Sequence, residues 1–185
     1  LPFIVGNALL GFLMVSTNVS LSLRISSYML ETGIGTAADG AMIMSISTFA
    51  GFLAGIIFGS MSEKLGKHLL TVSLATGLTG LFVIIIANNF VLVAAGASLV
   101  GFCVTCCTSK VFGSLPEHLP SNTLATANAC VLVGCNMGSF TAPFLLRIVD
   151  QINPAINASF WADGFIYTGL IIWVILNQFV LKKNY

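Results

Sequence analysis

The stretch GSMSEKLGKH, residues 59–68, interrupts an otherwise apolar sequence. In a chain of 185 residues with only 7 % charged side chains, it gathers four ionisable residues within six positions: Glu63, Lys64, Lys67 and His68. The apolar runs GFLAGIIFG and LLTVSLATGL lie directly before and after it. We therefore expect a polar turn between two apolar helices, reversed at Gly66, since glycine adopts positive φ at low cost.

The composition is that of a membrane protein. Hydrophobic residues make up 57 % of the chain and the mean hydropathy is +1.00, whereas soluble domains average about 45–50 % apolar and about a quarter charged. The net charge of +1 provides no basic surface for nucleic acid. The expected partners are therefore membrane lipid, a small-molecule solute and other membrane-embedded protein.

Six apolar runs are long enough to form transmembrane helices, which need roughly 20 residues each. They cover about residues 2–24, 40–61, 69–87, 90–112, 122–146 and 160–181. The short connections require antiparallel neighbours in one all-α bundle, so residues 1–185 are expected to form a single six-helix domain. Six helices divide into two triplets, and because three is odd the second triplet would be inverted relative to the first, as in inverted-repeat transporters.

Lysine and arginine placement predicts the orientation, because short positively charged loops remain cytoplasmic. One side would hold five lysines: Lys64, Lys67, Lys110, Lys182 and Lys183. The other would hold two arginines and four acids: Arg24, Arg147, Glu31, Asp39, Asp150 and Asp163. We expect a multi-pass protein of the plasma membrane or a bacterial inner membrane with both chain ends cytoplasmic. The apolar pattern starts at residue 1 without a signal-peptide pattern, so the chain is interpreted as a piece of a longer protein.

Small residues mark the middle helix of each expected triplet. Residues 40–61 contain Gly51, Gly55 and Gly59, which form two overlapping G-x-x-x-G units, and residues 122–146 contain Gly134 and Gly138. Such spacing allows close helix approach in lipid. The glycine face of residues 40–61 can serve static packing within the bundle or a sliding contact with a second domain. Pro143 is expected to make a flexible point in the fifth helix.

Polar residues inside apolar spans are candidates for function. In residues 2–24, Asn7, Gly11, Asn18 and Ser22 recur at helical spacing, and in residues 122–146 Asn128 and Asn136 share a face. Each asparagine can simply bond a neighbouring helix, or it can contact a solute. Arg24 can extend to the membrane surface, bind an anion, or pair with Glu31 or Asp39.

The sequence indicates no enzyme, cofactor or metal site. Cys103, Cys106 and Cys107 have zinc-like spacing, but they lie in an apolar helix without a nearby histidine. The odd total of five cysteines argues against a disulfide framework. His68 and His118 both fall in expected loops, so no intramembrane nucleophile–histidine pair is formed.

The turn also carries a family resemblance. Gly59, Glu63, Lys64, Gly66, Lys67 and His68 resemble the G-x-x-x-D-[RK]-x-G-[RK]-[RK] loop of the major facilitator superfamily, which joins the second and third helices of each six-helix half. Glu replaces Asp and His replaces the last basic residue, which suits the weaker copy in the C-terminal half. YMLETGIGTAADGAMI (28–43) and NMGSFTAP (136–143) resemble that half's outer loop and fifth helix.

This resemblance implies a secondary transporter working by alternating access, with an N-terminal six-helix half of the same protein as its partner. In the family the first, second, fourth and fifth helices of each half line the central cavity. That arrangement favours Asn7, Asn18, Asn128 and Asn136 as solute contacts and the 59–68 loop as a cytoplasmic gate. Two other functions stay open: a six-helix scaffold or assembly factor that transports nothing, and a half-size carrier that homodimerises.

Overall fold

The computed structural model describes residues 2–181, and over that range every regular element is helical. The elements are α1 (Pro2–Glu31), α2 (Ala37–Leu65), the short 3₁₀ helix η1 (Gly66–His68), α3 (Leu69–Ile85), α4 (Phe90–His118), α5 (Ser121–Ile152) and α6 (Ala158–Leu181). Lys182 and Lys183, which contribute to the expected orientation, lie outside the described residues.

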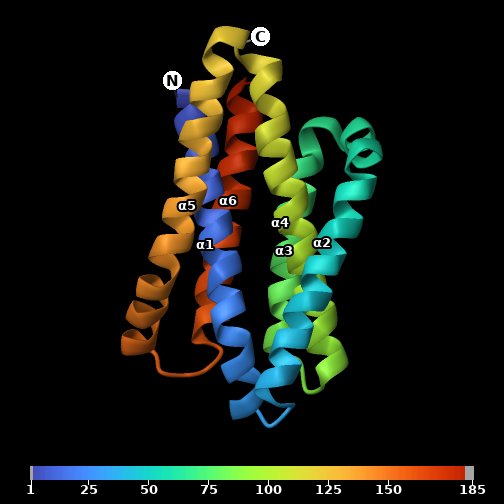
Figure 1. Cartoon of the computed structure of the whole chain (residues 1–185), viewed down its shortest axis with the longest axis vertical. Helices are drawn as coiled ribbons and strands as arrows, with labels where there is room; N and C mark the ends of the chain where they lie inside the picture. The colour runs from blue at the N-terminus through green and yellow to red at the C-terminus, as the bar shows by residue number, and fades with distance from the viewer. Residues whose placement is uncertain (1, 182–185) are drawn as a thin grey trace.

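Five helical stretches are long and apolar enough to cross a membrane: Pro2–Glu31, Ala37–Ile85, Phe90–His118, Ser121–Ile152 and Ala158–Gln178. The second of them contains both α2 and α3, and the chain reverses between these two helices (Figure 1). The reversal is at Gly66, where φ is +49° and the backbone N–H donates to the carbonyl of Ser62. The predicted positive φ of Gly66 is thus confirmed.

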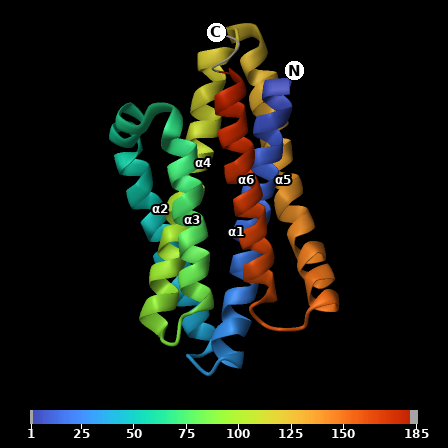
Figure 2. The same cartoon turned by 180° about the vertical axis from the view of Figure 1, so that it is seen from behind.

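The helices form an elongated bundle with two distinct faces. α3 and α6 lie together on one face, toward the viewer in Figure 2, and α1, α2 and α5 lie on the other, toward the viewer in Figure 1. One end of the bundle holds the N-terminus, the α2–α3 turn and the α4–α5 turn. The other end holds the α1–α2, α3–α4 and α5–α6 connections.

Two helix pairs approach closely through glycine. α5 packs on α1 with Gly134 and Gly138 directly against the backbone carbonyls of Ala8 and Phe12, so that a Cβ at either glycine would overlap an oxygen atom. α4 packs on α2 with Gly101 against the carbonyl of Ser47. The close contacts in these pairs therefore depend on missing side chains, as expected where lipid provides no hydrophobic drive between helices.

Most helices extend beyond the expected spans, whereas α3 ends at Ile85, two residues before its expected end. Polar side chains cap the starts of α2 and α4. Thr36 and Asp39 form a capping box at the start of α2, in which the Thr36 side chain accepts from the backbone N–H of Asp39. Asn89 caps α4 by accepting from the N–H of Leu92 at 2.9 Å. α5 continues as one helix on both sides of Pro143.

Candidate solute-binding site

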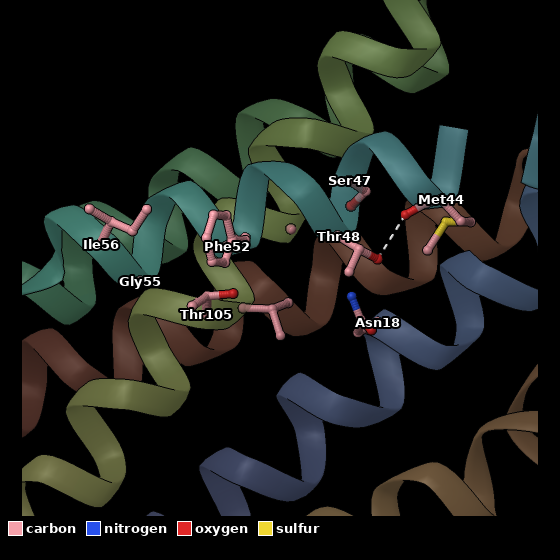
Figure 3. Close-up of a pocket in the computed structure, with 11 residues that line it drawn as sticks. Asn18, Met44, Ser47, Thr48, Phe52, Gly55, Ile56 and Thr105 are labelled. Carbon is pink, nitrogen blue, oxygen red and sulfur yellow. Dashed lines mark hydrogen bonds between the residues drawn. The ribbon is translucent and has the colours of Figure 1, made fainter. Parts of the chain in front are cut away.

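An open cleft of 630 Å³ lies between α1, α2 and α4 (Figure 3). Its lining residues are Asn18, Met44, Ser47, Thr48, Gly51, Phe52, Gly55, Ile56, Gly101, Val104 and Thr105. None of these side chains is ionisable, and most of them are apolar or lack a side chain. A few polar groups on a mainly apolar concave wall are typical of small-molecule sites.

Two polar groups of the cleft remain available for a ligand. Ser47 donates to the carbonyl of Ala97 at 2.7 Å, and Thr48 donates to that of Met44 at 2.9 Å. In contrast, among the described residues neither the Asn18 amide nor the Thr105 hydroxyl has a hydrogen-bond partner. Figure 3 shows the Asn18 amide directed from α1 toward α2 across the cleft.

Two glycines of α2 shape the cleft in different ways. Gly51 is buried, and a Cβ there would lie 2.6 Å from Thr105 Oγ1 and 3.2 Å from the carbonyl oxygen of Gly101. Gly55 is exposed, and the nearest atom to a Cβ there would be Thr105 Cγ2 at 3.8 Å. Gly51 therefore serves packing against α4 within this chain, while Gly55 leaves open space along the same helix.

The other predicted solute contacts lie outside the cleft. Asn7 Nδ2 donates to the carbonyl of Phe3 in its own helix at 3.1 Å, and so bonds neither a neighbouring helix nor the cleft. Asn128 and Asn136 are exposed on α5, and neither lines the cleft. Thr105, which sequence reasoning missed, comes from a run of cysteines and small residues in which it shows no distinguishing pattern.

The structure gives Arg24 an ion-pair partner that was not among the alternatives considered for it. Arg24 of α1 pairs with Asp150 of α5, and not with Glu31 or Asp39. The Arg24 side chain is 15 % exposed and that of Asp150 is 44 % exposed. Glu31 and Asp39 are nearer in sequence, but Asp39 is held in the α2 capping box, and close α1–α5 packing brings Asp150 to Arg24.

Asp163 also differs from expectation. The charge pattern of the sequence predicts that it lies with the polar residues of one membrane side, whereas in the structure it lies within α6 with only 5 % of its surface exposed. α6 begins at Ala158, two residues before its expected start, so Asp163 lies more than one turn inside the helix. The signal for its burial was its apolar context, FWADGF.

Residues 4–184 match the model of the Major Facilitator Superfamily. The chain belongs to the major facilitator superfamily. No curated protein matches it at a significant level. The chain is an integral multi-pass membrane protein, because several of its helices are apolar enough to cross a membrane. Its family is one of solute transporters.

In this facilitator chain residues 59–68 are not the expected loop but the C-terminal end of α2 followed by η1, and their charged side chains are accessible. Glu63, Lys64, Lys67 and His68 are all exposed, and within residues 2–178 none of them takes part in an ion pair. Gly59 faces open space, with no atom within 4 Å of a Cβ there. Gln178 Nε2 donates to the Lys67 carbonyl at 2.6 Å, which ties η1 to the end of α6.

Proposed function

We propose that this chain is the C-terminal six-helix half of a facilitator-type secondary transporter, which moves a small solute across the membrane by alternating access. The observation that carries the proposal is the open cleft between α1, α2 and α4, with Asn18 and Thr105 unpartnered among the described residues. An apolar wall with a free amide, a free hydroxyl and no charge suits an uncharged, partly apolar solute.

The proposed inverted repeat is supported by matching helix pairs. If helices α1–α3 and α4–α6 are the two repeats, α1 corresponds to α4 and α5 corresponds to α2. The α1–α5 pair then corresponds to the α4–α2 pair, and both pairs are in extensive contact. Gly11 of α1 and Gly101 of α4 then occupy corresponding helices, and both lie close to their partner helix. A Cβ at Gly11 would meet Cys135 Sγ of α5 at 2.8 Å. A Cβ at Gly101 would overlap the carbonyl oxygen of Ser47 of α2. Gly51 of α2 corresponds in the same way to the glycines of α5.

An N-terminal half of the same protein is the proposed partner. α2 and α5 each present exposed large apolar side chains: Phe49, Phe52 and Ile56 on α2, and Met137, Phe140 and Phe144 on α5. Asn128 and Asn136 lie on the same exposed helix α5. In the proposed transporter, these two helices close the central cavity against the other half, and the two asparagines contribute to that cavity.

Solute uptake by the full-length protein tests the proposal. Small uncharged organic solutes would first be screened by their effect on the melting temperature, and a stabilising solute would then be used for uptake into proteoliposomes. Asn18→Leu should abolish uptake and the thermal shift, because it removes the free amide and fills the cleft. Asn7→Leu is the matched control and should retain both, since its amide bonds only its own helix.

Two results would overturn the proposal. No uptake or stabilisation by any solute, in a protein that is folded and inserted, would favour the scaffold function. Full uptake in Asn18→Leu would show that the solute path does not use this cleft. Activity from the 185-residue chain expressed alone would favour the homodimerising half-size carrier over the two-half arrangement.

A further inference from the structure

A second, smaller cavity of 130 Å³ lies between α1, α5 and α6. Its polar lining consists of Ser16, Ser20, Ser159 and Asp163, and the remaining wall is apolar. Ser16 and Ser20 lie one turn apart on α1, and Ser159 and Asp163 lie one turn apart on α6. Asn18 falls between the two α1 serines in sequence and therefore points to the opposite side, into the solute cleft.

Two oxygen atoms of this cavity are buried without a hydrogen-bond partner among the described residues. Asp163 is 5 % exposed and Ser159 is 1 % exposed, and both Asp163 Oδ2 and Ser159 Oγ are buried without a hydrogen-bond partner. Ser16 and Ser20 are 2 % and 6 % exposed. Unsatisfied buried polar atoms are costly and point to a missing ligand.

The Asp163 carboxylate has no counter-charge in the part of the chain that the structure describes. The nearest cation on α1 is Arg24, one turn beyond Ser20, and it pairs with Asp150 of α5 instead. Arg147 of α5 is exposed, and α3, which also packs on α6, has no charged residue. A buried carboxylate inside a membrane helix requires a compensating positive charge or a bound proton.

We propose that this cavity binds one sodium ion, with the Asp163 carboxylate supplying the charge and the hydroxyl oxygens of Ser16, Ser20 and Ser159 supplying neutral ligands. Hard cations take oxygen ligands, and a single carboxylate balances a single positive charge. A proton on Asp163 would neutralise the charge but would leave Ser159 unsatisfied. Water alone would satisfy the hydroxyls but would leave the negative charge of Asp163 uncompensated.

The test uses purified full-length protein in detergent. Melting temperatures are measured as NaCl replaces choline chloride at constant ionic strength and pH, and binding of radioactive sodium is measured in parallel. The wild type should show a saturable rise in melting temperature and saturable sodium binding, because a ligand that binds only the folded state stabilises it. Potassium at the same concentrations should give a smaller shift, since the cavity is small.

Three variants assign the site. Asp163→Asn should lose the sodium-dependent shift and should be more stable than the wild type in choline chloride, because the uncompensated charge is gone. Ser159→Ala should raise the half-saturating sodium concentration roughly 10- to 100-fold, the effect of one lost polar contact to a charge. Ser98→Ala is the matched control and should bind sodium normally, since Ser98 only bonds the Ala94 carbonyl of its own helix.

The proposal fails if the wild type melts at the same temperature in NaCl and choline chloride. A melting temperature that depends on pH but not on sodium would identify Asp163 as a protonated acid instead. A sodium shift that persists in Asp163→Asn or is unchanged in Ser159→Ala would place the ion elsewhere. If Asp163→Asn does not fold, the half-saturating sodium concentration of Ser159→Ala decides whether the proposal holds. Because these readouts need no solute, they are independent of the transport proposal.

Discussion

The Arg24–Asp150 ion pair joins two helices and is unequally buried, so its two halves should respond differently to mutation. Asp150→Asn would leave the Arg24 guanidinium without a counter-charge. The Arg24 side chain is only 15 % exposed, and its Nε has no hydrogen-bond partner among the described residues. Arg24→Gln would leave a carboxylate that is 44 % exposed and partly hydrated. Removing one partner of a fully buried pair costs about 3–5 kcal/mol, and exposed pairs contribute about 0–1 kcal/mol.

We therefore expect Asp150→Asn to destabilise the protein by roughly 1–3 kcal/mol, an intermediate value, and Arg24→Gln to destabilise it less. The measurement is thermal or denaturant unfolding in detergent, with the double variant completing a mutant cycle. Arg147→Gln is the control, because Arg147 is exposed and has no ion-pair partner among the described residues. Equal losses in the two single variants would contradict the asymmetric burial.

At the scale of the helices, the sequence predicted where the helices lie along the chain but not which side of each helix faces the cleft or a neighbouring helix. Hydropathy and charge located the apolar spans, and the GKH turn reverses where Gly66 was expected to allow it. What depends on helix rotation could not be read from spacing alone. Asn7 and Asn18 belong to one polar stripe, yet only Asn18 reaches the cleft. Asp150 became the partner of Arg24 through α1–α5 packing, which is a long-range property.

Gly51 and Gly55 lie on the same helix but in different surroundings, and substitutions at these two positions test which face of α2 packs on α4. Gly51→Leu should prevent stable folding, because its Cβ would collide with Thr105 and with the backbone of α4 at Gly101. Gly55→Leu should insert and fold normally but inactivate transport, because the added side chain occupies the open cleft or its contact with the other half. Overpacking at a close helix contact typically costs about 1–3 kcal/mol or more.

Expression level, detergent melting temperature and uptake separate the two glycine variants. Gly55→Ala is the graded control and should remain active, since a methyl group there meets only Thr105 Cγ2 at 3.8 Å. Wild-type transport by Gly55→Leu would show that this part of α2 faces lipid. Normal stability of Gly51→Leu would mean that α2 and α4 can separate without cost.

At the scale of the proposed two-half transporter, residues 59–68 carry more charge than the proposed cytoplasmic position requires. Lys64 and Lys67 suffice for positive-inside anchoring, but Glu63 lies at the C-terminal end of α2, where the helix dipole disfavours an anion. It is exposed and forms no ion pair with any described residue. A partner on the cytoplasmic end of the other half, engaged in the outward-facing state and released in the inward-facing one, would explain the acid.

Such a switching pair contributes about 1–3 kcal/mol, which shifts a two-state population roughly 5- to 150-fold. Glu63→Gln should therefore preserve expression and orientation but increase cytoplasmic labelling of a cysteine introduced at Thr48 in the cleft, with the exposed Cys130 replaced by serine. Glu117→Gln is the matched control, because that acid already pairs with Lys110 at 3.6 Å within the chain. Unchanged labelling together with normal transport would leave Glu63 as a solvated surface residue, since an acid that biases the two states must alter their populations when its charge is removed.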